Sequence, residues 1–126
     1  MNRSSVSRPV FLTDYPVAFA ALSKVRPEAF PVAERFELYL AGVEVGNAYS
    51  ELNDPLAQRA RFEAERLERR TLGYPEFDPD PAYLAALDQG LPPSGGIAVG
   101  IDRLVMLLLD VPDVRRTLAF PWPMPT

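Results

Sequence analysis

The pattern of hydrophobic and polar positions is most regular over residues 36–49, where apolar and polar side chains alternate. Alternation with a period of two is typical of a strand that is buried on one face. The dipeptide Ala41-Gly42 interrupts the pattern and suits a two-residue turn. The segment is therefore predicted to be a β-hairpin with strands near 36–41 and 43–49.

Two stretches predict helices, near residues 55–72 and 81–89. Each begins at an Asp-Pro pair, in which the aspartate can cap the helix and the proline takes the first helical position. A glycine follows each stretch, as is common after a helix. In the first stretch, apolar side chains gather on one side of the helical wheel and most of the others are Arg and Glu. These apolar residues are Leu56, Ala57, Ala60, Ala64 and Leu67.

The C-terminal third predicts a strand, a helix and a second strand. The sequence GGIAVGI at 95–101 is typical of a buried strand, and Asp102 is a plausible cap for a helix over 102–109. The sequence TLAF at 117–120 is predicted to be a final strand. Because strands and helices do not alternate regularly, the fold class predicted is α+β, an antiparallel sheet flanked by helices.

Composition narrows the possible chemistry. The chain has 126 residues, which fits one domain, and it contains neither cysteine nor histidine. Disulfides, thiol nucleophiles, His-ligated zinc and Ser-His-Asp catalysis are therefore excluded. The net charge of −4 is unlike that of a duplex-binding module. The apolar runs are too short to span a membrane and the N-terminus lacks a signal-peptide core. We therefore expect no membrane association and a cytoplasmic location. Residues 1–10 are expected to be flexible.

The hairpin brings two carboxylates together. With a two-residue turn, Glu37 and Glu44 become diagonal neighbours on one face, roughly 7–8 Å apart at the backbone. Gly46 would stand opposite Glu37 and leave a gap beside it. Two carboxylates next to a gap suit Mg²⁺, which completes its shell with phosphate and water. The alternative interpretation is a solvated acidic face with no ligand.

Two further polar residues follow on the same segment. Strict alternation assigns Asn47 to the opposite face from Glu37 and Glu44, unless a bulge at Gly46 intervenes. Glu51 comes just past the strand, where an isolated acid is most often a surface residue.

The glycine-rich stretch SGGIAVGIDR at 94–103 matches neither GxGxxG nor a P-loop. It does predict Arg103 in the first turn of a helix, where a cation opposes the helix dipole. An arginine in that unfavourable position suggests a role such as holding phosphate oxygens or stacking on a base. The alternative is that Arg103 pairs with a nearby carboxylate.

Two blocks of sequence together resemble a known family. The sequence ERFELYLAGVEVGNAYSELNDP at 34–55, followed by GLPPSGGIAVGIDRLVMLL at 90–108, closely resembles the C-terminal part of the class II lysyl-tRNA synthetase catalytic core. The second block is similar to motif 3 of that class. The resemblance extends from about Pro9 to Pro121. It implies that residues 11–126 form part of a class II aminoacyl-tRNA synthetase-like catalytic domain.

The resemblance implies roles for individual residues. Glu37 and Glu44 match the acids that hold ATP and its Mg²⁺ ions, and Arg103 matches the motif 3 arginine that grips ATP. Asn47 matches the asparagine that contacts the substrate amino acid near its carboxylate. Glu51 matches the acid that pairs with the side-chain ammonium of lysine, and a carboxylate suits that task because an unpaired buried charge is costly.

Two details resemble a subfamily, the stand-alone elongation factor P lysine ligases. The stretch RLERRTLGYPEFDPDPAYLAAL at 66–87 is more similar to these ligases than to the synthetases proper. Ala98 stands where synthetases usually carry glycine, and with Gly96 it belongs to the implied substrate-binding set. The resemblance implies lysine or β-lysine as substrate and elongation factor P as acceptor. The alternative for Ala98 is ordinary strand packing.

The resemblance also has gaps. In the family, motif 1 at the dimer interface and motif 2 with its catalytic arginine would precede the segment that matches Pro9. We therefore expect a fragment, a truncated gene, or a chain completed by a homodimer partner or another polypeptide, with little ATP–pyrophosphate exchange alone. The alternative function is a non-catalytic paralogue that binds a nucleotide or a protein. A tRNA partner is less favoured because no basic patch is visible.

Overall fold

In the computed structural model, which describes residues 8–122, the predicted hairpin is formed by β3 (Val32–Leu40) and β4 (Val43–Ser50). Ala41 and Gly42 connect the strands with φ values of 47° and 76°. Two successive positive φ values give the turn a twist that matches that of the paired strands. The hairpin and its turn are thus confirmed.

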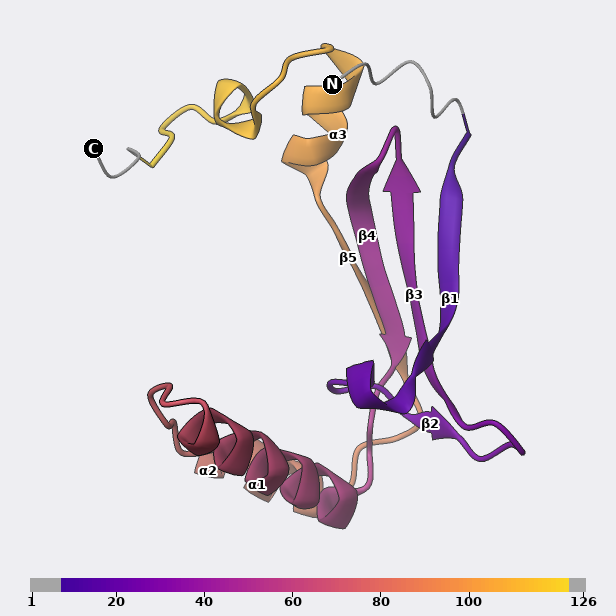
Figure 1. The fold of residues 1–126 in the computed structure, drawn as a ribbon, viewed down its shortest axis with the longest axis vertical. Coiled ribbons are helices and arrows are strands. Elements are labelled where there is room, and N and C mark those ends of the chain that lie inside the picture. Colours follow the sequence, from indigo (N-terminus) through magenta and orange to yellow (C-terminus); the bar gives the residue numbers. More distant parts are fainter. Residues whose placement is uncertain (1–7, 123–126) are drawn as a thin grey trace. The chain divides into compact units, whose positions relative to one another are not determined.

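The hairpin belongs to a five-stranded sheet in the order β1-β3-β4-β5, in which β2 also pairs with β3 (Figure 1). The remaining strands are β1 (Val10–Pro16), β2 (Val25–Arg26) and β5 (Gly95–Val99). Strand β2 pairs antiparallel with β3, with Val25 opposite Ala33. The Glu51 N–H donates to the Ser94 carbonyl and the Gly100 N–H to the Val45 carbonyl, a pattern that makes β4 and β5 antiparallel. The predicted α+β class with an antiparallel sheet is confirmed.

The predicted helices are present and their aspartate caps explain where two of them begin. The helices are α1 (Pro55–Thr71), α2 (Pro81–Asp88) and α3 (Ile101–Leu108), with 3-10 turns η2 (Val17–Phe19) and η3 (Val114–Thr117). Asp54 accepts hydrogen bonds from the backbone N–H groups of Leu56 and Ala57 at 2.9 and 3.1 Å. Asp80 accepts one from Ala82 at 2.8 Å. These bonds satisfy N–H groups that lack a partner within the helix.

Several expectations for the C-terminal third are wrong. The residues 117–120 are not a strand, because Asp113 caps the 3-10 turn η3 and Thr117 closes it by donating to the Val114 carbonyl. Helix α3 begins at Ile101 with Gly100 as its cap, so Asp102 is already inside the helix. All residues of β5 are exposed, although the sequence predicted a buried strand.

The chain divides into two compact units. Unit 1 comprises Met1–Thr13, Phe36–Ala48 and Ile97–Thr126, and unit 2 comprises Asp14–Arg35 and Tyr49–Gly96. The buried apolar side chains of unit 1 are Val45, Ala48 and Met106, and those of unit 2 are Ala20, Ala33, Leu52 and Leu87. The strands β1, β3, β4 and β5 each contribute residues to both units.

The expected flexible N-terminus at residues 1–10 falls mostly outside the described residues, and its last residue, Val10, begins β1. Within the described range, none of the helices is long and apolar enough to cross a membrane.

Helix α1 does not bury the side that its apolar pattern suggested. Leu56 and Leu67 are 77% and 61% exposed, whereas Gln58 is fully buried. One turn later, Arg61 donates from Nη1 to the carbonyls of Ala21 and Ser23 at 2.6 and 2.7 Å. Burial lowers the pKa of the Arg61 guanidinium below its usual value. Arg61 of α1 therefore holds the segment around Ser23.

Candidate functional site

The predicted site residues are divided between the two units. Unit 1 contains five of them, and unit 2 contains the other two. Those of unit 1 are Glu37, Glu44, Asn47, Ala98 and Arg103, and those of unit 2 are Glu51 and Gly96.

Glu37 is a buried acid on β3, with only 8% of the residue exposed. The Tyr39 hydroxyl donates to Glu37 Oε2 at 2.6 Å. Residues two apart on a strand lie on the same face, so the spacing of Glu37 and Tyr39 in the sequence already allowed this contact. Sequence analysis missed Tyr39, which holds one oxygen of the carboxylate in a defined direction.

The gap expected beside Glu37 at Gly46 is not present. A Cβ atom built on Gly46 would lie 3.5 Å from both Leu38 Cβ and Ile97 Cδ1, so this position faces apolar side chains. The prediction failed because Val45 and Gly46 are both buried, and two successive buried residues break the strict alternation on which it relied.

Asn47 and Ala98 lie on β4 and β5. Asn47 is half-buried and Ala98 is exposed. The alternation of buried and half-buried positions breaks at Val45 and Gly46, just before Asn47. Only after such a break could the Asn47 side chain turn toward Glu37 and Glu44. The bulge at Gly46 stays a prediction.

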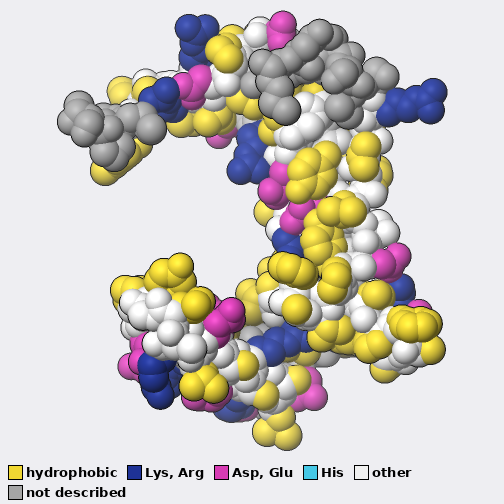
Figure 2. Space-filling model, viewed as in Figure 1, with side chains coloured by type: hydrophobic (Ala, Val, Ile, Leu, Met, Phe, Trp, Pro, Cys, Tyr) yellow, Lys and Arg dark blue, Asp and Glu magenta, His cyan; other side chains and the backbone are white. Residues whose placement is uncertain are grey.

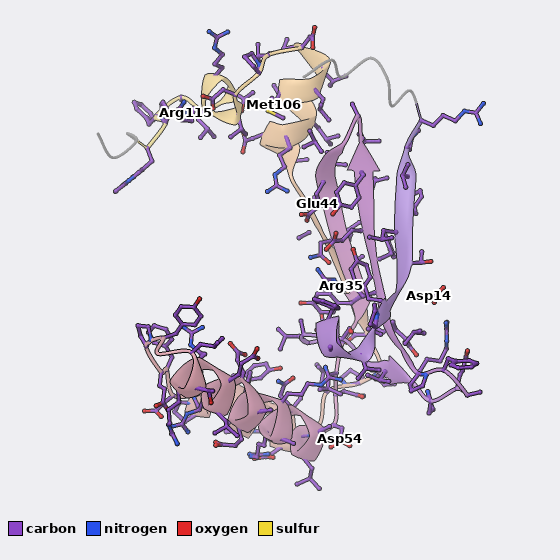
Figure 3. The ribbon with its side chains drawn as sticks, viewed as in Figure 1. Asp14, Arg35, Glu44, Asp54, Met106 and Arg115 are labelled. Atoms are coloured by element: carbon purple, nitrogen blue, oxygen red, sulfur yellow. The ribbon has the colours of Figure 1, made fainter. Side chains whose placement is uncertain are left out.

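Arg103 contacts Glu44 in two ways. Its Nη1 donates to the Glu44 backbone carbonyl at 2.8 Å and lies 3.6 Å from Glu44 Oε2. Figure 3 marks Glu44 on β4. The pairing with a nearby carboxylate, one of the two roles considered for Arg103, is present. It leaves 49% of the Arg103 side chain and 36% of the Glu44 side chain exposed, so both can still meet a ligand.

Gly100 determines how Arg103 lies. A Cβ at Gly100 would come within 3.2 Å of Arg103 Cδ and 3.5 Å of its Cβ and Cγ. The arginine stem therefore folds back over a residue that has no side chain. The Gly100 N–H also donates to the Val45 carbonyl at 2.9 Å, which fixes the start of α3 against β4. Sequence analysis missed this role, although the Gly-x-x-Arg spacing over one helical turn is its signal.

In unit 2, Glu51 and Gly96 are neighbours. The Glu51 N–H donates to the Ser94 carbonyl at 2.9 Å, and Glu51 also forms a β-bridge with Ser23. A Cβ at Gly96 would lie 3.6 Å from Glu51 Oε1. The carboxylate is thus adjacent to a backbone surface that no side chain covers. Glu51 is half-buried, so the expectation of an ordinary surface acid is incomplete.

Tyr83 on α2 is a second residue that sequence analysis missed. Burial raises the pKa of the Tyr83 hydroxyl, and the electrostatic influence of Glu51 and Tyr49 raises it further. Its ring meets Phe62 edge to face at a centroid distance of 6.2 Å. Tyr83 therefore belongs to the surroundings of Glu51 in unit 2.

A metal ion bound by Glu37 or Glu44 would have few ligands from the protein. Within residues 8–122, no three or more Asp and Glu side chains gather as a metal-binding group. A cation at Glu37 or Glu44 would therefore need oxygen atoms from a bound phosphate or from water. That is the usual arrangement for Mg²⁺ bound together with a nucleotide.

Comparison with known proteins gives a consistent family. Residues 2–123 match the family described as tRNA synthetases class II (D, K and N). The chain is 47% identical over 119 residues to a lysine–tRNA ligase of Pediococcus pentosaceus and 50% identical over 115 residues to one of Dehalococcoides mccartyi. These alignments cover 94% and 90% of this chain but 24% and 23% of the relatives.

A lysine–tRNA ligase of Gloeobacter violaceus is 46% identical over 119 residues, with 94% of this chain and 24% of the relative covered. The chain thus spans about a quarter of the length of the curated relatives it matches. The family match covers nearly all of the described residues and agrees with the α+β fold. This chain belongs to the class II tRNA synthetases of the D, K and N group and is a lysyl-tRNA synthetase-related domain.

Proposed function

We propose that this chain contributes the ATP-, Mg²⁺- and lysine-binding part of a lysine-activating, adenylate-forming ligase. The observation that carries the proposal is the contact of Arg103 with Glu44 in unit 1, in a chain whose relatives are lysine–tRNA ligases. In this proposal, residues 11–126 belong to the catalytic domain and residues 90–108 form its motif 3.

The nucleotide side of the proposed site uses three residues. Glu37 and Glu44 supply hard oxygen ligands of the kind that Mg²⁺ takes, and Arg103 supplies a permanent cation for phosphate oxygens. The Tyr39 hydroxyl donates to Glu37 Oε2 at 2.6 Å and holds that carboxylate in a defined direction. Bound ATP would supply the phosphorus that the amino-acid carboxylate attacks, and these side chains would orient it and offset its charge.

The residues proposed for the amino acid are Asn47, Ala98, Glu51 and Gly96. Glu51 would pair with the distal ammonium of the substrate, since a carboxylate offsets the desolvation of a cation. The uncovered backbone at Gly96 leaves room beside that carboxylate. Ala98 would shape the pocket, where a single methyl group can shift selectivity by roughly 1 kcal/mol.

Within the family we favour the elongation factor P lysine ligase type. The support is the stretch at 66–87 together with Ala98, as set out from the sequence. The acceptor would then be a lysine of elongation factor P, and the substrate would be lysine or β-lysine. Relatives named lysine–tRNA ligases make tRNA the competing acceptor, and a homodimer or a second polypeptide could complete the site.

A non-catalytic nucleotide- or protein-binding module is the second candidate. It is favoured by the same pair that supports catalysis, because Arg103 Nη1 already serves the Glu44 carbonyl and carboxylate. An arginine that only fixed the start of α3 to β4 would make these two contacts.

The substitution Glu51→Gln tests the lysine-activating function. It removes the charge and keeps the shape, so calorimetric affinities for lysine and β-lysine should fall roughly tenfold or more, while affinity for Mg·ATP stays unchanged. The control Glu28→Gln alters an exposed acid of the same unit, which pairs with Arg26, and should change neither. Equal losses for lysine and ATP would assign Glu51 to the metal site. Mg·ATP binding without any lysine binding would favour the non-catalytic module.

A further inference from the structure

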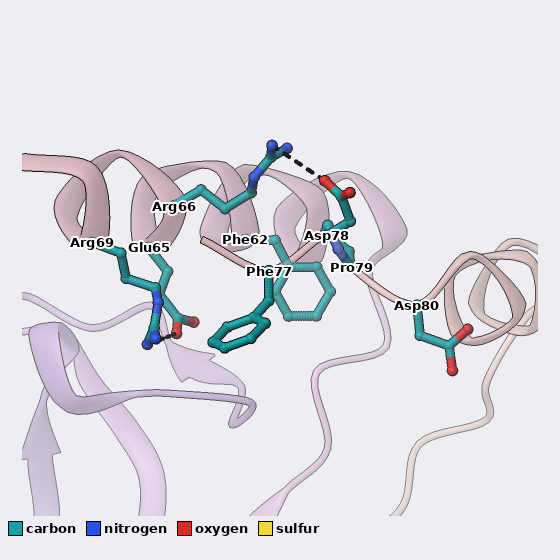
Figure 4. Close-up of a pocket in the computed structure, with 8 residues that line it drawn as sticks. All are labelled: Phe62, Glu65, Arg66, Arg69, Phe77, Asp78, Pro79 and Asp80. Atoms are coloured by element: carbon teal, nitrogen blue, oxygen red, sulfur yellow. Dashed lines mark ion pairs between the residues drawn. The ribbon is translucent and has the colours of Figure 1, made fainter. Parts of the chain in front are cut away.

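A small cavity in unit 2 shares no residue with the proposed catalytic site. It lies between the C-terminal half of α1 and the segment at 77–80 (Figure 4). Its lining residues are Phe62, Glu65, Arg66, Arg69, Phe77, Asp78, Pro79 and Asp80. The volume is about 230 Å³, below the range of roughly 300–1,000 Å³ of pockets for drug-sized ligands. The cavity therefore suits one long side chain better than a nucleotide.

The two aromatic rings of the cavity lie between its two ion pairs (Figure 4). The Phe77 ring already accepts a cation, because the Arg69 guanidinium carbon is 5.1 Å from its centroid. Phe77 remains 67% exposed, so most of its surface is available to a partner. An exposed phenyl ring attracts a planar guanidinium through its negative face and through stacking.

The charges around the rings favour an additional cation. Three carboxylates line the cavity, Glu65, Asp78 and Asp80, against two guanidinium groups, and Asp80 also caps α2. Charged side chains of both signs lie among hydrophobic ones over the region of α1 and α2 (Figure 2). An incoming anion would have to compete with these carboxylates.

Both guanidinium groups are already engaged. Arg66 lies 3.3 Å from Glu63, 3.3 Å from Asp78 and 3.9 Å from Glu76. Arg69 donates from Nε to the Pro75 carbonyl at 2.7 Å and lies 3.9 Å from Glu65. The Asp78 side chain is 90% exposed and can take a second partner.

One wall of the cavity also has an unused donor. The Arg66 Nε atom is buried and has no hydrogen-bond partner among the residues that the structure describes. A buried donor without an acceptor is unfavourable. The accessible part of the cavity combines an aromatic surface with an exposed carboxylate.

We propose that this cavity binds an arginine side chain of a partner protein, with the guanidinium against Phe77 and Asp78. This inference goes beyond the proposed catalytic function and does not depend on it. The chain's own Arg69, which lies over Phe77, is the internal example of the same contact.

The test is a nuclear magnetic resonance titration of the full ¹⁵N-labelled chain with N-acetyl-arginine N-methylamide. Saturable shifts should appear at the amides of the cavity residues. N-acetyl-norleucine N-methylamide, which lacks the charge, should bind about threefold to fivefold more weakly. Equal binding of the two probes, or the absence of saturable shifts with the arginine probe, would overturn the proposal.

Matched variants assign the binding to the cavity. Asp78→Asn should weaken the arginine probe about twofold to fivefold, and Phe77→Ala should weaken it by a similar factor. Glu68→Gln, an exposed acid of α1 outside the cavity, should leave binding unchanged. Circular dichroism checks that each variant is folded, and the exposed Asp78 position keeps the test valid if Phe77→Ala unfolds. Equal binding by Asp78→Asn and Glu68→Gln contradicts the proposed site, as does displacement of the probe from the unchanged chain by a short RNA.

Discussion

On the surface formed by α1, Arg59 and Arg70 each donate two hydrogen bonds to a single carboxylate, whereas Arg103 in the first turn of α3 approaches its carboxylate only at 3.6 Å. Arg59 bonds to Asp88 at 2.8 and 2.6 Å, and Arg70 bonds to Glu76 at 2.9 and 2.8 Å. A structural role is enough to explain Arg59 and Arg70, because each guanidinium has a geometrically matched carboxylate partner.

Arg103 differs in two respects. Its hydrogen bond goes to the backbone carbonyl of Glu44, and the carboxylate of that residue is only within ion-pair distance. A matched pair is complete without a ligand, whereas a loosely paired arginine beside a half-buried acid retains capacity for one. The comparison indicates that arginines of similar exposure can have structural or binding roles according to how fully their partners engage them.

The largest expected effect is on nucleotide affinity, and it tests whether Arg103 differs in role from the fully paired arginines. Arg103→Ala removes a charged donor, so affinity for Mg·ATP should fall about 10- to 100-fold. The matched control Arg70→Ala removes an arginine from a complete pair and should leave affinity for Mg·ATP unchanged. Isothermal titration calorimetry measures both. A loss of thermal stability in Arg103→Ala with unchanged ATP affinity would instead give Arg103 the same structural role as Arg70.

The next effect concerns stability and separates caps from ion pairs in unit 2. Asp54→Ala removes an acceptor that serves two N–H groups at the start of the 17-residue helix α1. The free energy of unfolding should fall by about 1 kcal/mol, within the range of 0.5–2 kcal/mol for lost caps. Urea denaturation followed by circular dichroism measures the change.

The cap of α2 provides a comparison for the prediction on Asp54→Ala. Asp80 serves one N–H group of the eight-residue helix α2, so Asp80→Ala should cost less than Asp54→Ala. Arg59→Ala removes one exposed ion pair and should also cost less than the loss of the Asp54 cap. The reverse order would mean that ion pairs, not caps, stabilise this surface.

The smallest effect is a pH dependence at η3, where a matched pair occurs in unit 1. The Arg115 guanidinium bonds to both carboxylate oxygens of Asp113, and with the Arg115 backbone N–H it lowers the pKa of Asp113 from 3.8 to about 2. Because the folded-state pKa is depressed, the pair stabilises the folded chain above the usual aspartate pKa. That contribution is lost as pH falls through about 2.

A carboxyl ¹³C titration checks this expectation. Asp113 should titrate near 2 in the unchanged chain and closer to 3.8 in Arg115→Gln. Figure 3 marks Arg115 on η3. A titration of Asp113 near 3.8 in both proteins would show that even a geometrically matched pair on this chain exerts little charge stabilisation.

The local elements followed from the sequence because their causes are local. The Asp-Pro caps at Asp54 and Asp80 and the turn at Ala41-Gly42 depend on neighbouring backbone groups alone, and each forms where the pattern predicts it. The spacing also singled out Glu37 and Glu44, whose role in binding stays a prediction. The predicted strand at 117–120 is absent, because Thr117 already ends the 3-10 turn that Asp113 caps.

Tertiary structure decided which surfaces these elements bury and which partners the site residues have. The apolar side of α1 is exposed and Gln58 is buried, while Arg61 of α1 donates hydrogen bonds to the carbonyls of Ala21 and Ser23. Contacts between residues distant in sequence, such as Arg103 with Glu44 and Gly96 with Glu51, depend on how β4 and β5 pair. Periodicity specifies the faces of a single element, but the pairing of elements depends on packing and hydrogen bonding across the whole sheet, which no local pattern encodes.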